Sequence, residues 1–115
     1  MSADTYVKPM SPTGKTVLVV AATSAPLGVA VPEAGTNAGF QFRLHNAGTV
    51  TAFLAFGASA AEAQSNAVIP TGTSQNAFPL PAGIVEVLSF PVGCFVSAIT
   101  ASSTANIFIT PGKGV

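Results

Sequence analysis

Charged residues are scarce in this sequence. Its 115 residues contain four Lys or Arg and four Asp or Glu, so the formal net charge is zero and charged side chains make up 7% of the chain, against roughly 25% in ordinary soluble proteins. Four scattered cations cannot neutralise many phosphates, so recognition of nucleic acid through a basic patch is not expected. The charge is also too low to keep a free surface dispersed. We therefore expect either a neutral Ser/Thr/Asn surface or a surface largely covered by partners.

Cysteine, tryptophan and long hydrophobic runs are lacking as well. Cys94 is the single cysteine, which excludes an intramolecular disulfide. The chain has no Trp and one Tyr, so a stacked aromatic platform for carbohydrate is poorly supplied. The longest wholly apolar run, Val17–Ala22, is far shorter than the ~20 residues of a membrane-spanning helix. No signal-peptide pattern opens the sequence, so we expect no membrane partner and no secretion by that route.

Small residues and recurring turn signals indicate the fold class. Ala, Gly, Ser and Thr together make up 53 of the 115 residues. Turn signals recur roughly every 8–12 residues, a spacing typical of all-β sandwiches and barrels. We predict a single all-β sandwich over residues 16–115, jelly-roll-like and with about eight strands. Residues 1–15, which hold three of the eight charges, are predicted to form an extended N-terminal arm.

Short apolar runs bounded by Gly, Pro, Asn and Ser mark the predicted strands. The predicted strands or extended segments cover residues 16–22, 27–31, 40–45, 50–57, 78–81, 84–90, 94–100 and 106–110. The run 16–22 is apolar on both sides and is predicted to be well buried. The runs 40–45 and 50–57 are predicted to form an antiparallel hairpin through the turn between them. Residues 58–67 are expected to be a loop with at most one helical turn, and residues 111–114 are expected to end the fold.

Two polar positions lie within these strands. In the run 40–45, Phe42 and Leu44 share one face, while Arg43 and His45 lie on the other. Glu86 stands among apolar residues of the run 84–90. It either meets Arg43 or a partner's cation, or it is an edge-strand charge that discourages aggregation between sheets, and we prefer the second interpretation.

The sequence supplies few groups for catalysis. His45 is the only histidine and the carboxylates are far apart, so neither a metal-ligand spacing nor a pair of catalytic carboxylates is recognisable. A Cys94–His45 nucleophile pair has no local signature around it. Cys94 opens an apolar strand and is expected to be a buried small hydrophobe. We predict a non-enzymatic binding or structural module without cofactor or metal.

Three segments carry a resemblance to a known class of proteins. Residues 52–60 (AFLAFGASA), 80–88 (LPAGIVEVL) and 107–114 (IFITPGKG) resemble small virion structural proteins of tailed bacteriophages, and the resemblance covers roughly residues 40–114. Such all-β proteins of phage heads commonly act as capsid decoration (cement) proteins. They bind the outside of the capsid and clamp neighbouring major capsid subunits, thereby stabilising the head.

The resemblance implies the same function here. Its implied partners are the major capsid protein and other copies of this chain, as a dimer or trimer, on the capsid exterior of a virion made in the bacterial cytoplasm. The alternative is a tail-tip or fibre-associated β-sandwich that recognises the host surface. We expect the arm, the polar side of the run 40–45 and the polar loop 71–76 to make contacts. The candidate contact residues are Tyr6, Val7, Lys8, Pro9, Met10, Arg43, His45, Gln75 and Asn76.

Overall fold

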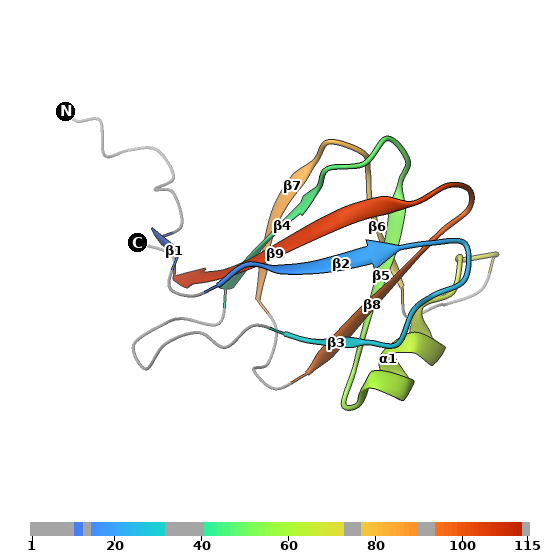
Figure 1. Cartoon of the computed structure of the whole chain (residues 1–115), viewed down its shortest axis with the longest axis horizontal. Coiled ribbons are helices and arrows are strands. Elements are labelled where there is room, and N and C mark those ends of the chain that lie inside the picture. The colour runs from blue at the N-terminus through green and yellow to red at the C-terminus, as the bar shows by residue number, and fades with distance from the viewer. Residues whose placement is uncertain (1–10, 13–14, 32–40, 73–76, 90–93, 114–115) are drawn as a thin grey trace.

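The chain folds into two antiparallel β-sheets with one short helix (Figure 1). The computed structural model describes residues 11–12, 15–31, 41–72, 77–89 and 94–113. The elements are β1 (Ser11–Pro12), β2 (Val17–Ala21), β3 (Val29–Ala30), β4 (Gln41–Asn46), β5 (Ala52–Gly57), α1 (Ala60–Asn66), β6 (Phe78–Leu80), β7 (Val85–Ser89), β8 (Phe95–Thr100) and β9 (Ala105–Lys113). The predicted all-β sandwich is confirmed.

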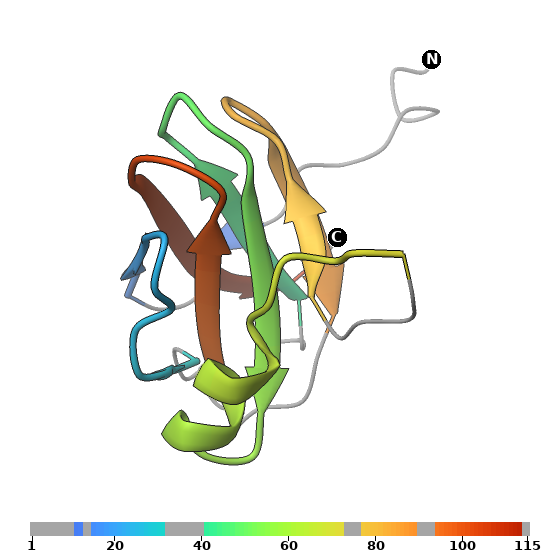
Figure 2. The ribbon, with the colours of Figure 1, turned by 90° about the vertical axis from the view of Figure 1, so that its right-hand side faces the viewer.

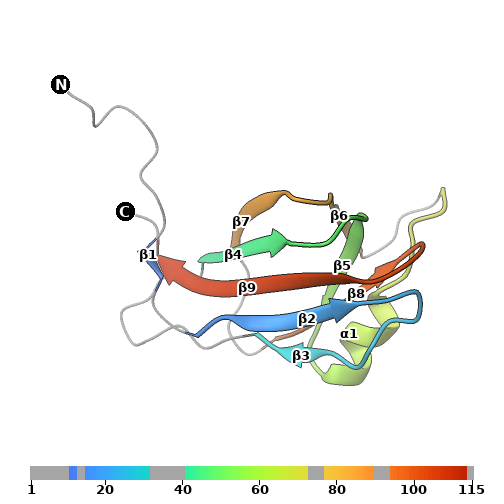
Figure 3. The same cartoon turned by 45° about the horizontal axis from the view of Figure 1, so that its top comes forward.

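Strand pairing follows a single scheme along the chain. Sheet A has the order β1-β9-β4-β7, with β2 also paired to β9, and sheet B has the order β3-β8-β5-β6. Figure 3 shows β7, β4, β9 and β2 of sheet A side by side. From β2 onward the chain doubles back on itself, because β2 pairs with β9, β3 with β8, β4 with β7 and β5 with β6. These pairs alternate between the two sheets, so the doubled chain is rolled into two layers.

The hairpin expected between the runs 40–45 and 50–57 is wrong. β4 belongs to sheet A and β5 to sheet B, so the turn between them carries the chain across the sandwich. Asn46 is fully buried at this crossing. Its Nδ2 donates to the carbonyl oxygens of Val50 (2.9 Å) and Leu80 (2.8 Å), and its Oδ1 accepts from the Gly48 N–H (2.8 Å). The side chain thereby ties the end of β4 to β6 of the opposite sheet.

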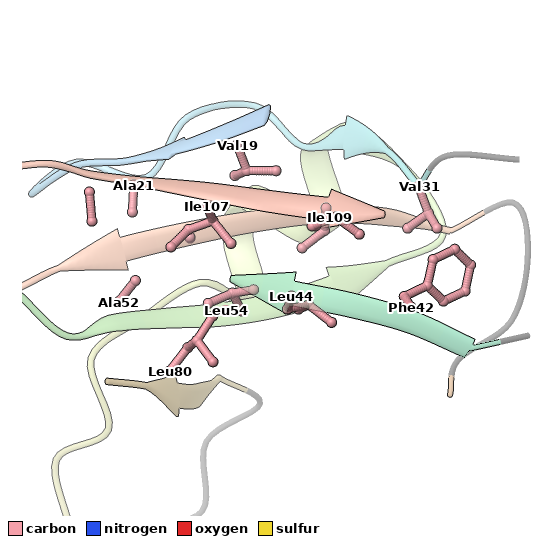
Figure 4. Close-up of a cluster of buried hydrophobic side chains, with 13 residues drawn as sticks. Val19, Ala21, Val31, Phe42, Leu44, Ala52, Leu54, Leu80, Ile107 and Ile109 are labelled. Carbon is pink, nitrogen blue, oxygen red and sulfur yellow. The ribbon is translucent and has the colours of Figure 1, made fainter. Parts of the chain in front are cut away.

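The hydrophobic core lies between the two sheets, as Figure 4 shows. Phe42 and Leu44 are fully buried there, which confirms the face assigned to them from the alternation of β4. Neighbouring strands supply the same inward positions, because side chains alternate along each strand. The other fully buried core residues are Val19, Ala21, Ala52, Leu54, Leu80, Val96, Ala98, Ile107 and Ile109.

The segment 58–67 forms a helix of two turns, where the sequence predicts a loop with at most one. The Ser59 hydroxyl accepts from the Glu62 N–H, and the Glu62 carboxylate accepts from the Ala58 N–H. This reciprocal capping compensates for the N–H groups that the first turn leaves unpaired. Packing adds to it, because Ala63 is fully buried. A Cβ at Gly57 would lie only 2.5 Å from the Ala63 N, so the helix rests directly on the backbone of β5.

The last strand is longer than the sequence predicts. The last strand does not end at Thr110, where the sequence predicts that residues 111–114 end the fold, because β9 continues through Pro111 to Lys113. Proline cannot donate to a strand ladder and is confined to edges and breaks. Pro111 pairs with Phe42 on the β4 side, while on the other side it lies at the break between β2 and β1. β1, which falls within the predicted arm, pairs with this end of β9. Residues 1–10 and 13–14 lie outside the described residues.

Candidate docking surface

Two of the nine candidate contact residues, Arg43 and His45, lie within the described structure. Both project from β4 to the side of sheet A that faces away from the core, because Phe42 and Leu44 occupy the inward positions. Arg43 is exposed and His45 is half-buried. The other seven residues, Tyr6, Val7, Lys8, Pro9, Met10, Gln75 and Asn76, lie outside the described residues.

A continuous row of side chains crosses sheet A at His45. Strand register places His45 opposite Phe108 of β9 and opposite Val85 of β7, and places Phe108 opposite Leu18 of β2. Residues directly opposite one another share a face of the sheet. The imidazole and the Phe108 ring confirm this contact, with ring centroids 6.5 Å apart and a tilt of 31°. The row is therefore apolar except for the imidazole.

A second row runs through Arg43. Its cross-strand neighbours are Val87 of β7 and Thr110 of β9. The Thr110 hydroxyl is 2.7 Å from that of Thr16, which closes the row on the β2 side. Arg43 thus lies between the exposed Val87 and the hydroxyl of Thr110, which already pairs with Thr16.

Large apolar side chains are exposed on this face. We define the outer face of sheet A as the surface formed by Leu18, Val20, Arg43, His45, Val85, Val87 and Phe108, together with the polar Gln41, Ser89, Asn106 and Thr110 on the same side of the sheet. The exposed fractions of Leu18 and Val20 are 45% and 44%, and those of Val85 and Val87 are 41% and 48%. A solvated sheet face ordinarily carries polar residues at such alternating positions. Contiguous exposed apolar area on a soluble protein marks an interaction site.

The outer face of sheet B is covered by the protein itself. A second cluster of buried and half-buried apolar residues lies there, on β5, β8 and the chain that covers them. Its members are Ala25, Phe53, Ala55, Ala67, Ala77 and Ile99. Hydrogen bonds hold the covering chain in place, since the Ser97 hydroxyl donates to the Pro26 carbonyl (2.6 Å) and the Gln64 amide to the Ala25 carbonyl (2.9 Å). Figure 2 shows α1 beside β5 and β8. The two outer faces are therefore not equivalent.

The described carboxylates lie away from the outer face of sheet A. Glu86 is exposed on β7, an edge strand of sheet A, as the preferred interpretation of this residue requires. It stands opposite the inward-facing Leu44, whereas Arg43 stands opposite Val87. Glu86 and Arg43 therefore project from opposite sides of the sheet. The less preferred interpretation, in which Glu86 pairs with Arg43, is wrong. Glu62 caps α1.

Cys94 and His45 are not brought together. Cys94 is half-buried just before β8 and packs against the core between the sheets, whereas His45 points away from it. Burial raises the pKa of the Cys94 thiol above its usual value, and a hydrogen bond with backbone opposes this effect. Within the described ranges no three His, Cys, Asp or Glu side chains gather closely enough to hold a metal ion.

Sequence reasoning missed most of the outer face of sheet A. The run 16–22 was expected to be well buried, but Leu18 and Val20 are exposed because nothing in the described structure packs on that side of β2. A run that is apolar on both sides is the only signal in the sequence, and it predicts burial on both sides.

Within the described part of the chain, no helix has the length and apolar character to cross a membrane. Comparison with family models, with curated proteins and with solved structures finds no match to this chain.

Proposed function

We propose that this chain is a non-enzymatic virion structural protein, a capsid decoration protein that binds the outer capsid surface and clamps neighbouring major capsid subunits. The outer face of sheet A carries the proposal. It presents four exposed aliphatic side chains around one cation and one histidine, and apolar surface of this kind is stabilised when a partner covers it. The resemblance of residues 40–114 to phage virion proteins supplies the class of partner.

Two further features support a structural role. We interpret the doubled and rolled strand order as a jelly roll, a closed arrangement of two layers that leaves few open edges. The low charge of the chain also suits a protein that is mostly covered in its working state. Many identical copies on a symmetric shell need only modest affinity each, because neighbouring contacts act together. Self-association as a dimer or trimer remains part of the proposal.

The first experiment is the copy number of this chain in purified virions, measured by quantitative mass spectrometry against the major capsid protein. A decoration protein is expected in hundreds of copies, and its removal should make the heads less stable. A handful of copies would instead support the tail-tip or fibre module that recognises the host surface. Absence from the particles would overturn both functions.

A second experiment tests the surface itself. Heads stripped of this chain are mixed with purified wild type, Val87→Asp or Leu27→Asp, and the bound chain is quantified. Leu27 is the matched control because it is an aliphatic residue with an exposed fraction of 60% that lies outside the outer face of sheet A. Val87→Asp should abolish rebinding and Leu27→Asp should leave it unchanged. Equal rebinding of both variants would exclude this face as the capsid contact.

A further inference from the structure

Arg43 is a charged residue with both apolar and polar neighbours on the outer face of sheet A. Its cross-strand neighbours on the outer face of sheet A are Val87 and Thr110, and its diagonal neighbours are Val85 and Ser89 of β7 and Phe108 and Gly112 of β9. None of these side chains carries a negative charge. Arg43 is exposed and has no hydrogen-bond or ion-pair partner among the described residues.

The described acids cannot reach Arg43 from within the same chain. Glu62 is engaged at the start of α1, beside sheet B. Glu86 projects from the opposite side of β7, since it pairs in register with the inward-facing Leu44. In the described structure the outer face of sheet A therefore has one cation and no carboxylate.

Docking would change the surroundings of this cation. A partner that covers Val85, Val87 and Phe108 also removes water from Arg43, which lies among them. A guanidinium that loses water without gaining a counter-charge is strongly destabilised. A carboxylate is the matching group, because it accepts two parallel N–H bonds from the planar guanidinium.

The same reasoning argues against a second copy stacked face to face. Two outer faces of sheet A would place two copies of Arg43 and, from the described residues, no carboxylate in one interface. Like charges in a dehydrated interface oppose association. On the described residues, the charge of this face therefore suits a different protein better than a second copy of this chain.

We infer that the outer face of sheet A binds a heterologous protein surface that is apolar and carries a carboxylate opposite Arg43. The inference deepens the proposed function, on which it rests for the identity of the partner as a capsid subunit. The chemistry of the face can be tested without the capsid, so the two can fail separately.

The first test uses two probes that share an eight-carbon tail, octanoate and octylammonium, titrated into the isotopically labelled full chain and followed by NMR. Octanoate should shift the amide signals of Val85, Val87 and Phe108 and the side-chain signal of Arg43, and should bind more tightly than octylammonium. Arg43→Gln should remove the preference and Arg43→Lys should keep part of it, while Lys15→Gln is the matched control that should change nothing. Equal binding of the two probes, or shifts that map elsewhere, would overturn the inference.

The second test uses the stripped heads and sedimentation. Arg43→Gln should rebind at least about thirtyfold more weakly than wild type, the loss expected when one partner of a buried charge pair is removed. Rebinding of Arg43→Gln equal to wild type would overturn the inference and leave the decoration function standing. If wild type does not rebind to the heads but octanoate is still preferred at Arg43, the decoration function is overturned, while the preference of this face for a carboxylate is supported. A wild-type dimer that Val87→Asp converts to monomer would place a second copy on this face and refute the heterologous partner.

Discussion

The outer faces of the two sheets differ in what covers them. On sheet B, α1, the segment around Ala25 and the chain that follows α1 bury Ala55 and Ala67 and partly cover Ile99. On sheet A, the equivalent surface leaves Leu18, Val20, Val85 and Val87 exposed. Both sheets come from one apolar sequence with few charges. The difference shows that the apolar character of a residue does not by itself tell whether the residue is buried in the core or exposed on a surface that binds a partner.

The same substitution on the two faces gives the largest expected contrast. Ala55→Asp places a carboxylate at a fully buried position under the covering chain of sheet B and should lower the free energy of unfolding by about 3 kcal/mol. Val87→Asp places it in solvent and should cost about 1 kcal/mol or less, mostly through strand propensity. Urea denaturation of both variants measures the difference. Equal losses would mean that the outer face of sheet A is covered in the free protein as well.

The next largest effect is expected at Asn46, where the chain crosses from sheet A to sheet B. Asn46→Ala removes three hydrogen bonds from a fully buried site and leaves the carbonyls of Val50 and Leu80 without this donor. We expect a loss of about 3 kcal/mol in the free energy of unfolding. Asn46→Asp should be no better, because its oxygens would face the same two carbonyl oxygens. A loss below about 1 kcal/mol in thermal or urea unfolding would show that water replaces the amide.

The cover of sheet B can be disturbed directly. Gly57→Ala would bring a Cβ to 2.5 Å from the backbone N of Ala63, so α1 must move away from β5. The expected cost is about 2 kcal/mol, the range found for overpacked interiors. Ala61→Gln, on the exposed side of the same helix, is the control and should be nearly neutral. An increase in binding of a hydrophobic dye by Gly57→Ala alone would show that sheet B had become exposed like sheet A.

The smallest expected effect concerns the single thiol between the sheets. Because burial raises the pKa of Cys94, less thiolate is present at a given pH than in the unfolded chain, and the thiolate is the reactive form. Alkylation of the folded chain by iodoacetamide should therefore be slower than alkylation in urea at pH 8, and should accelerate as the pH rises. Equal rates in the two states would contradict a half-buried, protonated thiol.

Local patterns predicted most of the individual strands. The alternation in β4 placed Phe42 and Leu44 inside and Arg43 and His45 outside, as the structure shows. Periodicity is reliable here because it depends only on the geometry of one strand. The pairing of strands depends on residues far apart in the sequence, and the hairpin expected between β4 and β5 failed for that reason.

The candidate surface could be predicted only in part. Arg43 and His45 stood out because they are rare polar residues at alternating positions, and the structure places them on one exposed face. Val85 and Val87 gave no such signal, because exposed and buried valines look alike in a sequence. Leu18 and Val20 were expected to be buried and are not. The helix was underestimated because its stability depends on the caps at Ser59 and Glu62 and on contact with Gly57.

By itself, the sequence determined the fold class, the inward face of β4 and the near absence of charge, since these follow from composition and from the two-residue period of a strand. Tertiary structure decided the rest. It joined β2 to β9 and β4 to both β9 and β7, so residues from four distant segments meet in one surface around Arg43. It also placed α1 over sheet B and not over sheet A. Contacts between distant parts of the chain decide which face of the sandwich is covered, and local sequence patterns do not predict such contacts.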